Sequence, residues 1–153
     1  MPFDFGKPIN TFTSSRNFNN PPDGGYKFKI VGSAIVEKNN KPKWELSLDI
    51  AEGPYEGAFT RFPRKVWQDL STDVGKSIAK RIIETIINDP ENTGMASPSV
   101  LESNVFDEST VVGLFVGGIC KTVEVKGKKY LNIDNVCAVS VALEKTPKTD
   151  SAF

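Results

Sequence analysis

The stretch YKFKIVGSAIVEKNNKPKWELSLDI, residues 26–50, decides the fold class. From Tyr26 onward, apolar side chains alternate with charged ones, a two-residue period that is typical of a β-strand. The EKNNKPK segment interrupts this period, because adjacent asparagines tolerate left-handed turn geometry and Pro42 has no N–H for a central ladder. Apolar residues then return at alternate positions from Trp44 to Ile50. The stretch predicts an antiparallel hairpin with one buried face, and it places Trp44 in the core.

A third strand and a helix are expected next. A Gly-Pro-Tyr-Glu-Gly turn leads into AFTRF, residues 58–62, which predicts a short strand that Pro63 ends. Asp73 is a suitable cap for a helix over residues 74–88. Apolar residues recur there at helical spacing, which predicts a core-facing stripe. The stripe comprises Val74, Ile78, Ala79, Ile82, Ile83, Ile86 and Ile87.

Two long strands are predicted near the end of the chain. A long, polar and acidic connection over residues 89–110 precedes them. Residues 111–125 and 129–141 then alternate around the tip KGKK, which indicates a hairpin that turns at Lys126-Gly127. Glycines at positions 113, 117 and 118 indicate a bend or bulge in the first of these strands.

The predicted order is therefore three strands, one helix and two strands. This mainly β order is that of the OB-fold, a five-stranded and partly open barrel with one α-helix between strands 3 and 4. An unrelated five-stranded α+β sandwich has the same order. We expect a single OB-fold-like domain over residues 26–143, a Pro/Asn-rich arm over 1–25, and a short flexible tail over 144–153.

Composition limits the class of protein. The 153 residues suffice for one core, and the 19 basic and 19 acidic residues give no net charge. No apolar run is long enough for a membrane span and no secretory leader is recognisable, so we expect a cytoplasmic protein without membrane contact. Cys120 and Cys137 do not face each other across the predicted hairpin, and we expect both to be reduced.

The motifs of common catalytic sites are missing from the sequence. There is no histidine, which excludes His-based acid–base chemistry and Ser-His or Cys-His nucleophile pairs. Two distant cysteines do not make a zinc site, and no glycine-rich phosphate loop follows a strand. The sequence therefore predicts a binding protein and not an enzyme, with no metal, no cofactor and no catalytic residue.

Cations and aromatic side chains occur together at three places. Binding of single-stranded nucleic acid requires cations for the phosphates and flat side chains for the bases. In an OB-fold, the loop after the first strand, the third strand and the tip of the last hairpin converge on one groove. The predicted DNA-binding residues are Lys38, Lys41, Lys43, Phe59, Arg61, Arg64, Lys65, Lys126, Lys128, Lys129 and Tyr130.

The aromatic residues in this set have competing interpretations. Phe59 and Phe62 lie on opposite faces of the predicted third strand, and Phe59 shares its face with Arg61, so Phe59 is the predicted stacking residue. Tyr130 lies on a polar face and is predicted to be exposed. The lysines of the tip are alternatively a solubilising turn.

Several short motifs resemble a known family. They are FDFG at residues 3–6, GGY at 24–26, LDIAEGPYEG at 48–57, VGLFVGGI at 112–119 and EVKGKKYLNIDNVCAVSV at 124–141. With these motifs the chain resembles the single-stranded DNA-binding proteins encoded by bacteriophages of Gram-positive bacteria. The resemblance implies an OB-fold, sequence-tolerant binding of single strands, and a role in phage DNA replication or recombination in the host cytoplasm. It also implies a homo-oligomer and association with phage or host replication proteins.

The sequence departs from this family at two places. Relatives commonly have an acidic, Tyr-containing turn after the fourth strand, whereas this chain has the basic tip KGKK. Phe153 is terminal, but Asp150 is the only acid near it, so recruitment of partners through the tail is not expected. An edge strand of an open barrel would be a natural dimer contact.

Two other functions remain open at this point. The first is a protein-interaction module of a replication or recombination complex that does not touch nucleic acid. Clustering of the predicted cations on one face would favour DNA, whereas scattered cations would favour a protein partner. The second is a small-molecule enzyme, which would show a deep pocket with two or more carboxylates.

Overall fold

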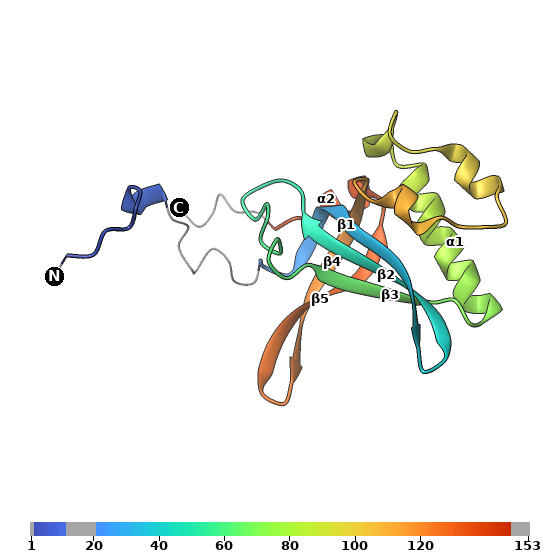
Figure 1. The fold of residues 1–153 in the computed structure, drawn as a ribbon, viewed down its shortest axis with the longest axis horizontal. Helices are drawn as coiled ribbons and strands as arrows, with labels where there is room; N and C mark the ends of the chain where they lie inside the picture. Colours follow the sequence, from blue (N-terminus) through green and yellow to red (C-terminus); the bar gives the residue numbers. More distant parts are fainter. Residues whose placement is uncertain (1, 12–20, 148–153) are drawn as a thin grey trace.

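The computed structural model describes residues 2–11 and 21–147, which contain a five-stranded antiparallel sheet (Figure 1). The strands are β1 (Gly24–Lys38), β2 (Lys41–Ile50), β3 (Arg64–Asp69), β4 (Phe115–Val125) and β5 (Lys128–Cys137). Their order in the sheet is β3-β2-β1-β4-β5, and helix α1 (Asp73–Ile87) lies between β3 and β4 in the chain. The mainly β class and the place of the helix are confirmed. In the described ranges β3 and β5 do not pair, so the sheet is not closed into a barrel.

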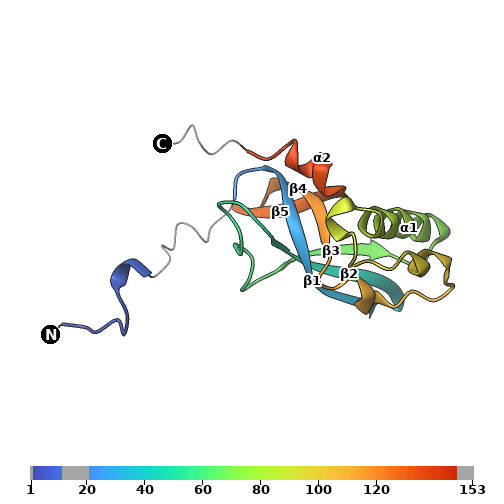
Figure 2. The same cartoon turned by 90° about the horizontal axis from the view of Figure 1, so that it is seen from above.

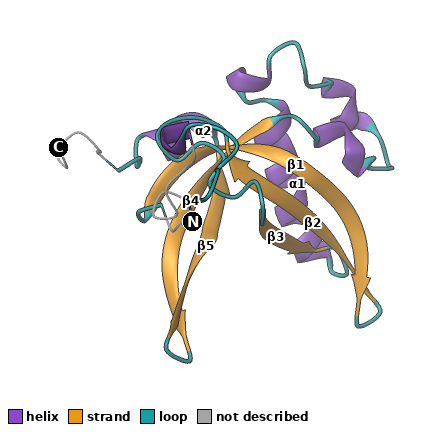
Figure 3. Ribbon diagram, turned by 60° about the vertical axis from the view of Figure 1, so that its left-hand side comes forward, coloured by secondary structure: helices purple, strands orange, loops and turns teal. Residues whose placement is uncertain are grey.

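The two long hairpins are the most prominent feature of the sheet. The β1–β2 and β4–β5 hairpins project in the same direction and diverge, with β3 between them (Figure 3). Asn39 and Asn40 turn the first hairpin at φ values of 56° and 62°, and Lys126 and Gly127 turn the second at 51° and 79°. Positive φ at both central residues is the geometry of the tight hairpin turn that matches strand twist. Both predicted turns are confirmed.

The core is formed by the sheet, by α1 and by residues of the two long connections, such as Phe59 and Val111. Trp44 is 1% exposed and its indole Nε1 donates a hydrogen bond of 2.9 Å to Ser33 Oγ, so its predicted burial is confirmed. The predicted helix stripe is confirmed at Ala79, Ile86 and Ile87, which are buried, and at Ile82 and Ile83, which pack against the core. It is wrong at Val74 in the first turn, which is 71% exposed. The largest fully buried apolar side chains are Trp44, Phe28, Ile30, Leu46, Leu48, Ile86, Val111, Val116 and Val139.

The predicted third strand is wrong in position. Residues 58–62 form turns, and β3 begins only after Pro63. The reason is Asp49, whose carboxylate accepts hydrogen bonds from Phe59 N–H at 2.8 Å and from the Thr60 hydroxyl at 2.6 Å. These bonds fold the segment back onto β2 and place Phe59 in the core, where its ring stacks against Phe28 at 6.4 Å. The expected exposure of Phe59 is therefore wrong, since 3% of it is accessible.

Thr72 and not Asp73 caps α1. Its hydroxyl accepts a hydrogen bond of 3.0 Å from Gly75 N–H, which satisfies one of the free donors at the helix start. The helix ends before Pro90, as predicted. Figure 2 shows the second helix, α2 (Val139–Leu143), near the C-terminal end of α1. The connection to β4 contains the 3₁₀ turns η3 (Pro90–Asn92), η4 (Pro98–Glu102) and η5 (Glu108–Val111).

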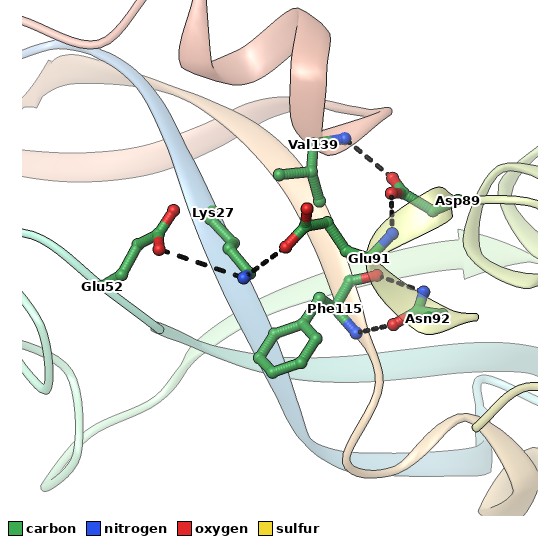
Figure 4. Close-up of polar contacts among 7 residues, drawn as sticks. All are labelled: Lys27, Glu52, Asp89, Glu91, Asn92, Phe115 and Val139. Atoms are coloured by element: carbon green, nitrogen blue, oxygen red, sulfur yellow. Dashed lines mark hydrogen bonds and ion pairs between the residues drawn. The ribbon is translucent and has the colours of Figure 1, made fainter. Parts of the chain in front are cut away.

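Three polar side chains join this connection to the sheet (Figure 4). Asn92 is fully buried, and its amide exchanges hydrogen bonds of 2.8 Å and 2.7 Å with the backbone of Phe115. Asp89 is buried and accepts a hydrogen bond of 2.8 Å from Val139 N–H. Lys27 lies over the Phe115 ring and pairs with Glu91 at 2.6 Å. The connection is therefore anchored at the start of β4 and at the start of α2.

The end of the chain differs from the predicted strand over residues 129–141. β5 ends at Cys137, and residues 139–143 form α2, because the Asp89 carboxylate caps the N-terminus of α2 where Ala138 has no capping group. Gly25 and Gly117 let the helix approach closely, since a Cβ at Gly25 would lie 2.0 Å from a backbone oxygen. Residues 145 and 146 of the predicted flexible tail are hydrogen-bonded to Gly25.

β4 begins at Phe115, later than the predicted position 111, because residues 108–111 form η5. The hairpin has a bulge, but it lies in β5 and not in the predicted first strand: the consecutive residues Ile119 and Cys120 of β4 pair with Asn135 and Ile133, which leaves Asp134 as the extra residue. Cys120 faces Ile133, as predicted, and Cys137 faces Gly117. Both cysteines are free, and burial raises the pKa of the Cys120 thiol to about 12.

The described part of the N-terminal arm, residues 2–11, contains one 3₁₀ turn, η1 (Ile9–Thr11), and no buried residue. Phe3 is 81% exposed and contacts Phe5 edge to face. Phe12 and Phe18 lie outside the described residues. Among the described helices, none has the length and apolar character that a membrane crossing requires.

Candidate nucleic-acid interface

A groove of about 730 Å³ lies between β3 and the β4–β5 hairpin, and α1 contributes to its lining. Side chains from β3, β4, β5 and α1 contribute to its walls. The lining residues are Pro63, Arg64, Lys65, Val66, Trp67, Gln68, Ile78, Arg81, Ile82, Lys121, Val123, Asn132, Ile133, Asp134, Asn135 and Val136. The groove thus lies where β3 and β5 do not pair.

The charged side chains of the groove are mostly basic. Arg64 and Lys65 come from β3, Arg81 from α1 and Lys121 from β4, whereas Asp134 is the one acid that lines it in the described chain. Arg64 and Lys65 were predicted binding residues, but Arg81 and Lys121 were not. Arg81 follows Ile78 by three residues, which puts both on one face of α1. This spacing was the signal that could have identified Arg81. Cations from three elements thus meet although the net charge of the protein is zero.

Arg64 is held by the residue predicted to stack on bases. The Arg64 guanidinium lies 4.5 Å from the centroid of the Phe59 ring, a cation–π arrangement that orients the side chain. Its Nε is buried and has no hydrogen-bond partner. The terminal nitrogens of the guanidinium are the donors that suit an anionic ligand in the groove. Phe59 therefore contributes to the site indirectly, because its buried ring orients the Arg64 guanidinium.

Trp67 is the exposed aromatic residue of β3. Half of its surface is accessible, and its indole Nε1 donates a hydrogen bond of 2.9 Å to Glu45. Glu45 also pairs with Lys65 at 3.3 Å, and Lys38 Nζ lies 5.7 Å from the centroid of the Trp67 ring. The Trp67 ring therefore connects the cations of the β1–β2 hairpin with the groove.

The β4–β5 hairpin presents two different faces. Val123 lines the groove and lies directly opposite Tyr130 in the register, and Val125 lies opposite Lys128. Residues directly opposite each other in an antiparallel pair share a face, so Tyr130 and Lys128 extend the groove face toward the hairpin tip. Lys129 pairs with Glu124 on the other face, because successive side chains alternate. Tyr130 is 49% exposed, and its predicted exposure is confirmed.

The other predicted cations lie outside the groove lining. Arg61 is exposed in the loop before β3, beside Phe62, which is 74% exposed. Lys41 and Lys43 lie near Asp69, whose pKa is lowered mainly by hydrogen bonds from Ser71 and further by these two lysines. Lys126 occupies the hairpin turn. The structure thus brings together part of the predicted set and separates the rest.

Carboxylates are dispersed over the described residues. Across residues 2–11 and 21–147, no three His, Cys, Asp or Glu side chains lie close enough together to hold a metal ion. The buried acids Asp49 and Asp89 accept hydrogen bonds from the backbone, which gives them a structural role. No family model matches the chain, and no curated protein is significantly similar to it.

Proposed function

We propose that the protein binds single-stranded DNA along the groove between β3 and the β4–β5 hairpin, without chemical conversion of the strand. The observation that carries the proposal is the meeting of Arg64, Lys65, Arg81 and Lys121 in one groove. Exposed aromatic rings border this groove at Trp67, and Tyr130 extends one of its faces. Cations neutralise phosphates, and aromatic rings stack on unpaired bases of any sequence.

The strand order supports an OB-like barrel as the scaffold of this function. An OB barrel has the neighbours β3-β2-β1-β4-β5 and is completed by contact between β3 and β5. The described sheet has this strand order, and β3 and β5 contact each other without pairing. In OB-folds the loops between strands 1 and 2 and between strands 4 and 5 border the ligand. In this protein those loops are the two diverging tips, which carry Lys38, Lys41, Lys126 and Lys128 (Figure 3).

The proposed biological role follows from the resemblance of the sequence motifs to phage single-strand binders. It is the protection of DNA in phage replication or recombination, in the host cytoplasm, by a homo-oligomer. Association with phage or host replication proteins belongs to the same proposal.

The test is a fluorescence-anisotropy titration of a labelled oligo-dT and of a duplex of equal length, at low and moderate salt. We expect tight binding of the single strand, weak binding of the duplex, and loss of affinity as salt rises. Trp67→Ala should weaken binding of the single strand, whereas Phe62→Ala should have a smaller effect because Phe62 is outside the groove lining. Absence of binding at low salt would refute the proposal.

Protein binding at the same surface is the second candidate. It is favoured by the exposed apolar side chains Val123, Val125 and Trp67, which a protein partner could also cover. The two functions differ in their response to salt, because phosphate contacts release counterions in proportion to their number. Failure to bind any oligonucleotide would leave protein docking as the function of this surface.

A further inference from the structure

Asp134 is an unexpected component of a groove that is otherwise basic. It lines the groove together with Arg64, Arg81 and Lys121. No ion pair within 4.0 Å and no hydrogen bond involves its carboxylate in the ranges that the structure describes. A carboxylate at this place repels phosphates and would weaken a groove that served phosphate binding alone.

The position of Asp134 results from the β-bulge in the β4–β5 ladder. Ile119 pairs with Asn135 and Cys120 pairs with Ile133, so Asp134 is the extra residue without a partner. A bulge changes the direction of the extra side chain and recurs near functional sites. The same bulge leaves Asn135 beside Asp134 in the groove wall. The bulge in β5 thus places the carboxylate of Asp134, a hydrogen-bond acceptor, in the groove wall, where regular strand pairing would not place it.

Gln68 supplies a second acceptor from the opposite wall. Its side-chain amide nitrogen donates to the backbone oxygens of Asp69 at 3.3 Å and Gly75 at 3.2 Å. These bonds use the donor end of the amide and leave its oxygen as the group available to a ligand. Gln68 on β3 and Asp134 on β5 both line the groove.

We infer that the groove prefers bases with an exocyclic amino group, and in particular cytosine over thymine. Cytosine presents its N4 amino group as a donor, which pairs with the acceptor-only carboxylate of Asp134. Thymine presents the O4 acceptor at the same place, which faces the carboxylate unfavourably. The inference rests on the proposed binding of single-stranded DNA and adds a base preference to it.

The test compares labelled oligo-dC and oligo-dT of equal length by anisotropy, at low salt and slightly alkaline pH. Both strands contain only pyrimidines and carry the same charge, so a difference in affinity comes from the groups on the edges of the bases. We expect oligo-dC to bind about three- to tenfold more tightly, the range of the net contribution of one typical hydrogen bond. Asp134→Asn should bring the dC/dT ratio to one or below, since an amide both donates and accepts.

Glu124→Gln is the matched control. It removes an acid from the same hairpin, but the side chain of Glu124 is not on the face that carries Val123 and Tyr130. We expect this variant to keep the dC/dT ratio of the unmodified protein. Equal affinity of the unmodified protein for both strands, or a ratio that Asp134→Asn leaves unchanged, would overturn the base preference while the binding function stands. Absence of binding to either strand would refute the proposed function itself.

Discussion

The substitutions Arg81→Ala and Lys80→Ala, at neighbouring positions of α1, distinguish phosphate binding in the groove from a general effect of surface charge. Arg81 lines the groove, whereas Lys80 lines a different depression, beside Ile35 and Phe106. Both substitutions remove one positive charge from the same helix. Lys80 also pairs with Glu84 at 3.8 Å, but exposed pairs of this kind contribute a few tenths of a kcal/mol, so neither change should unfold the protein.

The expected magnitude follows from the number of cations in the groove. If each of the four basic groups contacts one phosphate, the slope of log affinity against log salt is about −2.8, since each contact contributes about −0.7 on a single strand. Affinity then falls about 50-fold between about 50 and about 200 mM salt. Arg81→Ala should reduce the slope to about −2.1 and the loss to about 20-fold.

The assay is a salt series of anisotropy titrations with one oligo-dT for the unmodified protein and both variants. Lys80→Ala should retain the slope of the unmodified protein, because only general electrostatics change. Equal slopes for Arg81→Ala and Lys80→Ala would refute the reasoning, since the groove would then not hold phosphates. Circular dichroism of both variants checks that the fold is retained.

Three further predictions concern stacking, packing and pH. Tyr130→Ala should weaken oligo-dT binding by about fivefold or more in anisotropy titrations, as one stacked base contributes about 1–3 kcal/mol, while Tyr130→Phe should retain most of the affinity. Phe59→Ala should lower the free energy of unfolding by about 3–5 kcal/mol in urea titrations, whereas Phe62→Ala should change it by less than about 0.5 kcal/mol because Phe62 is exposed. Burial raises the folded pKa of Cys120 to about 12 and also raises the pKa of Tyr26. The free energy of unfolding should therefore keep its full value below the unfolded thiol pKa and fall as pH rises through about 9 to 12. Cys120→Ala should reduce this alkaline loss, and equal losses in both proteins would contradict the assignment.

Local patterns predicted much of the fold. The period of two from Tyr26 to Ile50, the asparagine pair at the first tip and Lys126-Gly127 at the second each depend on neighbouring residues, and the structure has both hairpins. Trp44 was predicted to be buried from its place in the alternation, and it is. Tyr130 was predicted to be exposed from its polar neighbours, and it is.

Long-range contacts decided the positions that were predicted incorrectly. The alternation of residues 58–62 resembles a strand, but hydrogen bonds to Asp49 make it a turn and bury Phe59. Likewise, residues 139–143 form a helix because Asp89, 50 positions earlier, accepts the first free N–H. A sequence pattern contains no information about a partner so far away in the chain.

The candidate site shows the same division. The sequence alone determined that the protein has paired hairpins with basic tips, a helix with an apolar stripe, and no histidine for acid–base chemistry. Only the tertiary structure decided that β3 and β5 do not pair, that Arg81 and Lys121 join Arg64 in one groove, and that a bulge adds Asp134 to it. The physical reason is that hairpins and helices form from contacts between near neighbours, whereas a groove is formed by elements that meet only after the chain has folded.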